Sequence, residues 1–108
     1  MVIFEEIDMS YDEVVEKILK EKGVEQSTLM KTPCLRFNGD FITMMFTKEN
    51  ALIIKVSALR VNELIADGVG LEFNFTKKKF KEWVLIPMQY ENMYESLIYE
   101  ALAYAKNK

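Results

Sequence analysis

The side chain in this sequence with the greatest capacity for covalent chemistry is the thiol of Cys34, the only cysteine in the chain. A cysteine becomes a nucleophile when a nearby cation lowers the pKa of its thiol, and Arg36 lies two residues further on, which would place both on one face of a strand. The chain contains no histidine, so Ser-His-Asp and Cys-His catalysis are excluded, together with the commonest metal ligand. Because most free cysteines pack as small apolar residues, we expect Cys34 to be structural and the protein to be non-enzymatic.

Acidic and glycine residues offer no stronger candidates. Glu91 and Glu95 lie one helical turn apart, but acid–base catalysis needs a cleft that separates the pKa values of two groups, and the sequence shows no sign of one. Gly68 and Gly70 follow a predicted helix and precede a predicted strand, whereas phosphate-binding loops lead from a strand into a helix. We therefore expect a helix cap and a turn here, and no catalytic residue, cofactor or metal.

Four neighbouring lysines form the most concentrated positive feature, namely Lys77, Lys78, Lys79 and Lys81. Clustered ammonium groups could bind a phosphate, a carboxylate or an acidic partner segment. The simpler interpretation is a solvated turn whose lysines protect a sheet edge from aggregation. The net charge of −3 argues against direct binding of nucleic acid, which needs a broad positive field.

The elements that must position these residues are centred on a hairpin. Asn38 and Gly39 separate two apolar runs, Leu35–Phe37 and Phe41–Phe46. Asn-Gly between apolar runs favours a primed turn, because both residues tolerate a positive φ angle. A third apolar run, Ala51–Val56, follows a second turn. The pattern predicts a three-stranded antiparallel meander.

A helix is predicted before the meander. Ser10 and Glu13 form a capping box at its start, and Gly23 ends it as a C-terminal cap. Residues 24–30 are interpreted as a connector. Residues 1–9 could form a short edge strand or an arm packed on a neighbouring chain, and the pattern does not decide between them.

Further elements are predicted after the meander. Ser57 offers an N-cap for the first of them. They are a helix over Ala58–Ala66, strands over Leu71–Phe75 and Phe80–Ile86, and a last helix from about Asn92, with Glu95 in its capping box, to about Ala105. The order α-β-β-β-α-β-β-α predicts one α+β domain over residues 1–108. We expect a two-layer sandwich: a five-stranded, mostly antiparallel sheet with helices packed mainly on one face.

The central strands carry more apolar side chains than one layer of helices can cover. We expect these to face the helices: Ile42, Met44, Phe46, Leu52, Ile54, Val84 and Ile86. The opposite face would then hold Cys34, Phe41, Met45, Ile53, Trp83 and Leu85. Apolar patches rimmed by polar groups mark a subunit interface, a ligand cleft or a peptide-binding surface. The alternative, left open by the sequence, is that another part of the same chain covers this face.

The location of the protein is inferred from three features of the chain. The single cysteine allows no intramolecular disulfide, as is usual in a reducing compartment. Acidic residues stand in the first eight positions, where a signal peptide needs basic ones, and no apolar run reaches membrane-spanning length. We expect a cytoplasmic protein without a membrane partner.

Short motifs occur in a characteristic order, namely Met30–Leu35, Asn38–Phe41, Leu52–Lys55, Glu63–Gly68, Lys81–Val84 and Glu100–Ala101. In this order and spacing the chain from about Met30 to Ala105 resembles the TfoX amino-terminal-domain family and, more distantly, the YjbR-like domains. The resemblance implies an α+β domain of the secretion-chaperone-like kind, with dimerisation and peptide binding by fold analogy. Its best-known members regulate DNA uptake competence and carry a second domain. Because Lys31, Thr32 and Phe80 depart from the family pattern, we expect a divergent, stand-alone member.

Two functional hypotheses result. The first is a non-enzymatic binding or regulatory module that forms a homodimer, or binds a protein partner, through an apolar sheet face containing Phe41, Met45, Ile53, Trp83 and Leu85. The alternative is a binder of small anionic ligands that uses the Lys77–Lys81 turn.

Overall fold

The computed structural model describes residues 11–29, 31–75 and 78–107, with the backbone alone for residues 47, 74, 75 and 78–80. The elements in this part of the chain are α1 (Tyr11–Ile18), β1 (Val24–Leu29), β2 (Thr32–Phe37), β3 (Asp40–Phe46), η2 (Thr47–Glu49), β4 (Ala51–Lys55), α2 (Ala58–Ala66), β5 (Leu71–Phe75), β6 (Lys78–Pro87), η3 (Met88–Met93) and α3 (Tyr94–Lys106).

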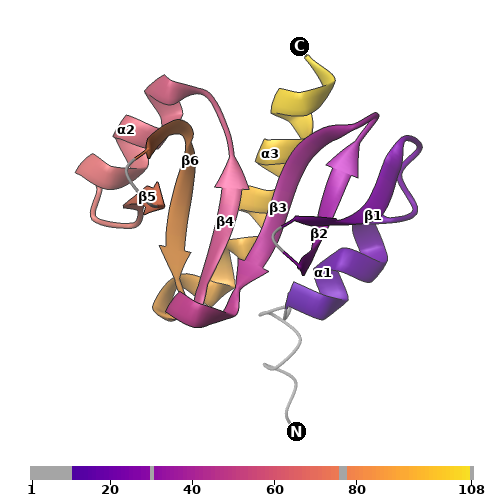
Figure 1. Ribbon diagram of the computed structural model, residues 1–108, viewed down its shortest axis with the longest axis horizontal. Coiled ribbons are helices and arrows are strands. Elements are labelled where there is room, and N and C mark those ends of the chain that lie inside the picture. The colour runs from indigo at the N-terminus through magenta and orange to yellow at the C-terminus, as the bar shows by residue number, and fades with distance from the viewer. Residues whose placement is uncertain (1–10, 30, 76–77, 108) are drawn as a thin grey trace, which may run out of the picture.

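The strands form one antiparallel sheet in the order β1-β2-β3-β4-β6-β5 (Figure 1). The predicted α+β class and the meander of β2, β3 and β4 are confirmed. The prediction of five strands is wrong, because the described residues form a sheet of six. The additional strand is β1, which was interpreted as a connector and pairs with β2 along its whole length. Its four central residues are polar, so it lacks the apolar alternation that reveals a half-buried strand.

Local turn and cap chemistry explains the middle of the chain. Asn38 and Gly39 have φ angles of 48° and 92°, as the predicted primed turn between β2 and β3 requires. Ser57 has an extended backbone, and its Oγ accepts a hydrogen bond from the backbone N–H of Arg60 at 3.2 Å. The bounds of α2 are therefore those that the sequence predicts.

The first and last helices differ from the prediction at their ends. Helix α1 ends at Ile18, and Gly23 lies in the turn that leads into β1 with a φ angle of 93°. The positive φ angle favours glycine here, and a Cβ atom at Gly23 would lie 2.6 Å from Cε1 of Phe37, so any other residue would also have to displace this ring. The predicted cap at Ser10 lies outside the described residues.

Helix α3 begins at Tyr94, after the 3-10 segment η3, with Met93 at its N-cap and no side-chain capping hydrogen bond. The capping box predicted for Asn92 and Glu95 is therefore wrong. Glu95 instead forms an ion pair with Lys17 of α1.

A β-bulge in β3 sets which side chains face the helices. Leu35 of β2 pairs with Thr43, but the next residue, Arg36, pairs with Phe41, so Ile42 is an extra residue in β3. A bulge shifts the alternation of the residues beyond it to the opposite face.

The predicted faces of the residues after this bulge are wrong. Met44 and Phe46 were expected to face the helices and instead belong to the cluster on the opposite face. Met45 was expected on the opposite face and instead packs against the helix-side core. The remaining predictions for β3 and β4 hold, since Ile42, Leu52 and Ile54 lie in the helix-side core, whereas Phe41 and Ile53 lie in the other cluster.

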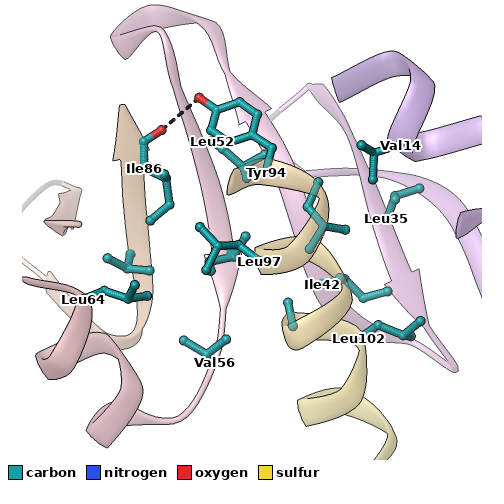
Figure 2. Close-up of a cluster of buried hydrophobic side chains, with 14 of the residues drawn as sticks. Val14, Leu35, Ile42, Leu52, Val56, Leu64, Ile86, Tyr94, Leu97 and Leu102 are labelled. Atoms are coloured by element: carbon teal, nitrogen blue, oxygen red, sulfur yellow. Dashed lines mark hydrogen bonds between the residues drawn. The ribbon is translucent and has the colours of Figure 1, made fainter. Parts of the chain in front are cut away.

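The helix-side core contains side chains from α1, α2 and α3 and from β2, β3, β4 and β6 (Figure 2). Val14 of α1 lies over Leu35, and Leu64 of α2 lies near β6 (Figure 2). Tyr94 is fully buried, and its hydroxyl donates a hydrogen bond to the backbone carbonyl of Ile86 at 3.0 Å. The three helices thus bury one face of the sheet, and α2 is the one that lies over the β6 side.

Candidate functional site

The face of the sheet opposite the helices carries a second apolar cluster. Its buried members are Cys34, Phe41, Met44, Ile53 and Phe73, with Leu29, Phe46, Trp83 and Leu85 packed around them and half-buried. Phe41 is only 6% exposed and Ile53 is not exposed at all. This second-face cluster is therefore largely enclosed within one copy of the chain.

Contacts between aromatic rings show how the second face is enclosed. Phe46 on β3 and Phe73 on β5 have ring centroids 5.9 Å apart, although β4 and β6 lie between these strands. Three strand spacings amount to about 14 Å in a flat sheet, so the side chains and the curvature of the sheet together bring the two rings into contact over the intervening strands. Trp83 continues this row, with its ring centroid 4.4 Å from that of Phe41 and 5.3 Å from that of Phe73. We call these four residues the aromatic row.

This arrangement changes the predicted interface. Phe41, Ile53, Trp83 and Leu85 do lie together, but the first two are buried by the protein itself, and Met45 packs on the helix side. Phe41 and Ile53 therefore need no second chain to cover them. Of the predicted set, only Trp83 and Leu85 retain partial exposure on this face.

Trp83 also lines a pocket of about 200 Å³ beside α2, β5 and β6. This pocket borders both clusters, because Val61 and Ile65 belong to the helix-side core whereas Phe73 and Trp83 belong to the second-face cluster. Helix α2 contributes Ala58, Val61, Asn62 and Ile65, and the two strands contribute Glu72, Phe73, Lys81 and Trp83. Five of the eight lining side chains are thus apolar, and the other three supply one ammonium, one carboxylate and one amide. Such a lining, apolar with a few polar groups, is typical of ligand sites.

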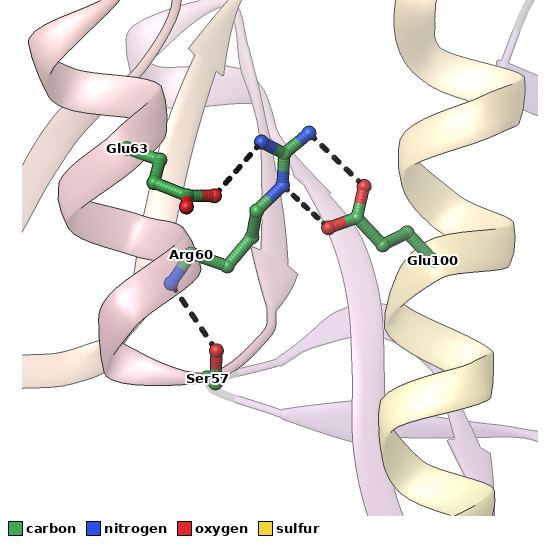
Figure 3. A network of polar contacts seen from close by, with 4 residues as sticks. All are labelled: Ser57, Arg60, Glu63 and Glu100. Carbon is green, nitrogen blue, oxygen red and sulfur yellow. Dashed lines mark hydrogen bonds and ion pairs between the residues drawn. The ribbon is translucent and has the colours of Figure 1, made fainter.

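Helix α2 is held over this pocket by polar contacts on its other side (Figure 3). The guanidinium of Arg60 donates two hydrogen bonds to the carboxylate of Glu100 on α3, from Nε at 2.5 Å and from Nη2 at 3.2 Å. It also donates to Glu63, one turn further along α2, at 3.3 Å. The carboxylate of Glu100 raises the pKa of Arg60. A two-bonded Arg–carboxylate pair fixes orientation as well as distance, so it positions the helical wall of the pocket.

Close approach of the chain behind the pocket depends on Gly70. A Cβ atom at this position would lie 2.6 Å from Cγ2 of Val84 and 3.2 Å from Cβ of Leu64. Gly68, two residues earlier, has a φ angle of 80°. The predicted turn at these glycines is confirmed, and Gly70 allows β5 to pack closely against α2 and β6.

The predicted anion-binding lysines are described in part. Lys77 and the side chains of Lys78 and Lys79 lie outside the described residues, whereas the exposed Lys81 lines the pocket beside Trp83. Lys81 of the predicted anion-binding lysines and Trp83 of the predicted interface therefore line the same pocket.

Cys34 is placed where its thiol is not activated. It is 2% exposed within the second-face cluster, and burial raises the pKa of its thiol despite the opposing influence of Arg36. The guanidinium of Arg36 donates hydrogen bonds to Oγ of Ser27 at 3.2 Å and to the carbonyl of Gly39 at 3.3 Å. The geometry favours the structural interpretation of this cysteine.

The two other polar residues of the pocket, Asn62 and Glu72, were not predicted as site residues. Ala58, Asn62 and Ile65 recur at helical spacing and so lie on one side of α2, which the sequence alone could indicate. The strands that this side faces depend on the chain topology, and for that the sequence holds no local signal.

Across 11–29, 31–75 and 78–107, no group of three or more His, Cys, Asp or Glu side chains is arranged to hold a metal ion. Within the same ranges no helix is long and apolar enough to cross a membrane.

Comparisons with models of protein families, with curated proteins and with solved structures found no match. The resemblance to the TfoX amino-terminal-domain family therefore stays a prediction from the sequence, and the site is interpreted from its own geometry.

Proposed function

We propose that this protein is a non-enzymatic binding module whose site is the pocket beside α2, β5 and β6. The observation that carries the proposal is the combination of a half-buried Trp83 with polar groups from three elements around one cavity of about 200 Å³. Any regulatory role would then act through the bound ligand.

The size of the pocket limits what it can hold. An apolar protein cavity of about 150 Å³ binds benzene, whereas drug-sized ligands need roughly 300–1,000 Å³. A pocket of about 200 Å³ suits a molecule with a single ring or a short branched chain. The same space would accept one apolar side chain of a peptide.

The proposal is tested by a screen of single-ring and short-chain compounds, read by thermal shift and by fluorescence. Trp83 is the only tryptophan in the chain, so its emission reports on the pocket directly. A ligand present at ten times its Kd stabilises the folded state by about 1.4 kcal/mol, which shifts Tm by several degrees in a domain of this size. The expected result is a compound that moves both Tm and Trp83 emission.

A pair of variants on α2 controls this screen. Ala58→Phe places a ring at the mouth of the pocket, whereas Ala66→Phe makes the same change at an exposed residue of α2 that does not line it. Binding should be lost in the first variant and kept in the second. Equal loss in both, or no active compound across the screen, would refute the pocket as the binding site.

Self-association is a second candidate, supported by a different observation. Leu71 on the edge strand β5 is 55% exposed, and its cross-strand partner is the half-buried Leu85. Cross-strand partners lie on the same face of a sheet, and a second copy of the chain pairing along β5 would cover both. Light scattering at high micromolar concentration should then give a dimer that Leu71→Glu converts to a monomer. A monomer for the unchanged protein would contradict this candidate.

A further inference from the structure

The charged and polar groups that line the pocket select a class of ligand. This inference rests on the proposed function. Lys81 comes from β6, Glu72 from β5 and Asn62 from α2, so the polar groups belong to three separate elements. The other five lining side chains are apolar. From this lining we infer that the ligand is a small aromatic monocarboxylate.

The negative group of the ligand follows from the donors that the pocket offers. The ammonium of Lys81 and the side-chain amide of Asn62 both donate hydrogen bonds, and a carboxylate accepts from both. A neutral amide of the same shape loses the charge-assisted part of this interaction.

The apolar body of the ligand follows from the neighbours of Lys81. Trp83 lies two residues further along the same strand and lines the same pocket, so the Cα atoms of the two residues are about 7 Å apart and their side chains extend from the same face. A carboxylate attached to a ring, or separated from it by one or two carbons, spans that distance. The ring then contacts the apolar side chains while the carboxylate reaches the ammonium.

The restriction to a single negative charge follows from Glu72. Its carboxylate lines the same small pocket, so a ligand with two negative charges meets repulsion as well as attraction. A second negative charge gains one more attraction to Lys81 but also one more repulsion from Glu72, so its larger loss of hydration is left uncompensated. A phosphate monoester is therefore a poorer ligand than a carboxylate of the same size.

The experiment compares three probes of matched shape, namely benzoate, benzamide and phenyl phosphate. Binding is followed by Trp83 emission and by two-dimensional amide NMR of the full chain. Benzoate should bind about tenfold more tightly than benzamide and phenyl phosphate. Lys81→Gln should remove the preference for benzoate over benzamide, and Glu72→Gln should improve binding of phenyl phosphate. Lys48→Gln, at an exposed lysine that does not line the pocket, should change nothing.

The outcomes separate this inference from the function on which it rests. Equal affinity for benzoate and benzamide overturns the carboxylate assignment but leaves a pocket that binds single rings. Tighter binding of phenyl phosphate than of benzoate overturns the restriction to one charge. If none of the three probes perturbs the amide signals of α2 or the emission of Trp83 at millimolar concentration, both the inference and the proposed function fail.

Discussion

Tyr94→Phe removes a single buried hydroxyl and gives the most quantitative test of the core. The side chain is fully buried, and its hydroxyl donates to the carbonyl of Ile86 at 3.0 Å. Because the ring is retained, no large cavity forms, and the change removes one hydrogen bond. We expect the free energy of unfolding to fall by about 1 kcal/mol near neutral pH.

The difference between the two proteins should then depend on pH in a defined direction. Burial, with a contribution from the charge of Glu91, raises the pKa of Tyr94 from its ordinary 10.0 to about 12. Since the folded-state pKa lies above the unfolded one, stabilisation by the neutral hydroxyl is complete below pH 10 and is lost as pH rises through 12. Linkage predicts a loss of about 1.4 kcal/mol at pH 11. Tyr11, whose pKa burial also raises to about 12, is present in both proteins and cancels in the comparison.

Urea unfolding followed by circular dichroism at pH 8 and pH 11 measures both quantities. The unchanged protein should be more stable than Tyr94→Phe at pH 8 and nearly equal to it at pH 11. Ile98→Val on the same helix is the control, because it costs about 1 kcal/mol without removing a titrating group, so its deficit should stay constant. If the deficit of Tyr94→Phe is also the same at both pH values, the assigned environment of this hydroxyl is wrong.

Three further predictions concern the walls of the pocket and the second face. A double-mutant cycle of Arg60→Gln and Glu100→Gln, measured by urea unfolding, should give a coupling free energy of about 1 kcal/mol, because the pair makes two hydrogen bonds but stays partly exposed. Additive effects of the two substitutions would contradict this. Gly70→Ala should lower Tm, because its Cβ would lie 2.6 Å from Cγ2 of Val84, and an unchanged Tm in thermal unfolding would show that this approach is not tight. The thiol of Cys34 should react slowly with Ellman's reagent in the native protein and rapidly in urea, because Cys34 is 2% exposed and burial raises the pKa of its thiol. Fast labelling of the native protein would instead show an accessible thiolate.

Elements with local chemical signals could be predicted from the sequence. The turn at Asn38 and Gly39 and the helix capped by Ser57 follow from short patterns whose physical basis is local, and the structure has both. Strand β1 could not be predicted in this way, because it is stabilised by pairing with β2 and its central residues are polar. The preference of a residue for a strand depends on the neighbouring strand, so a polar strand such as β1 carries no local apolar signal.

The candidate site also combines residues that the sequence could indicate locally with residues that depend on long-range contacts. Trp83 and Lys81 were chosen from the sequence for separate reasons, and their spacing of two residues places both on one face of the strand. Asn62 and Glu72 could not be added without knowing that α2 lies over β5 and β6, which is a long-range property of the fold. The bulge at Ile42 had the opposite effect, since one extra residue moved Met45 away from the face on which the alternation placed it.

The aromatic row gives the pocket a stiff wall. Trp83 contacts Phe41 with stacked rings and Phe73 with tilted ones, and Phe73 in turn contacts Phe46. The indole cannot swing aside to admit a guest without separating rings that belong to three strands. A cavity bordered in this way keeps its shape when empty, so a fitting molecule loses little affinity to reorganisation of the protein. The pocket would also discriminate between ligands by size, because the aromatic row cannot move aside to make room for a ring larger than the cavity.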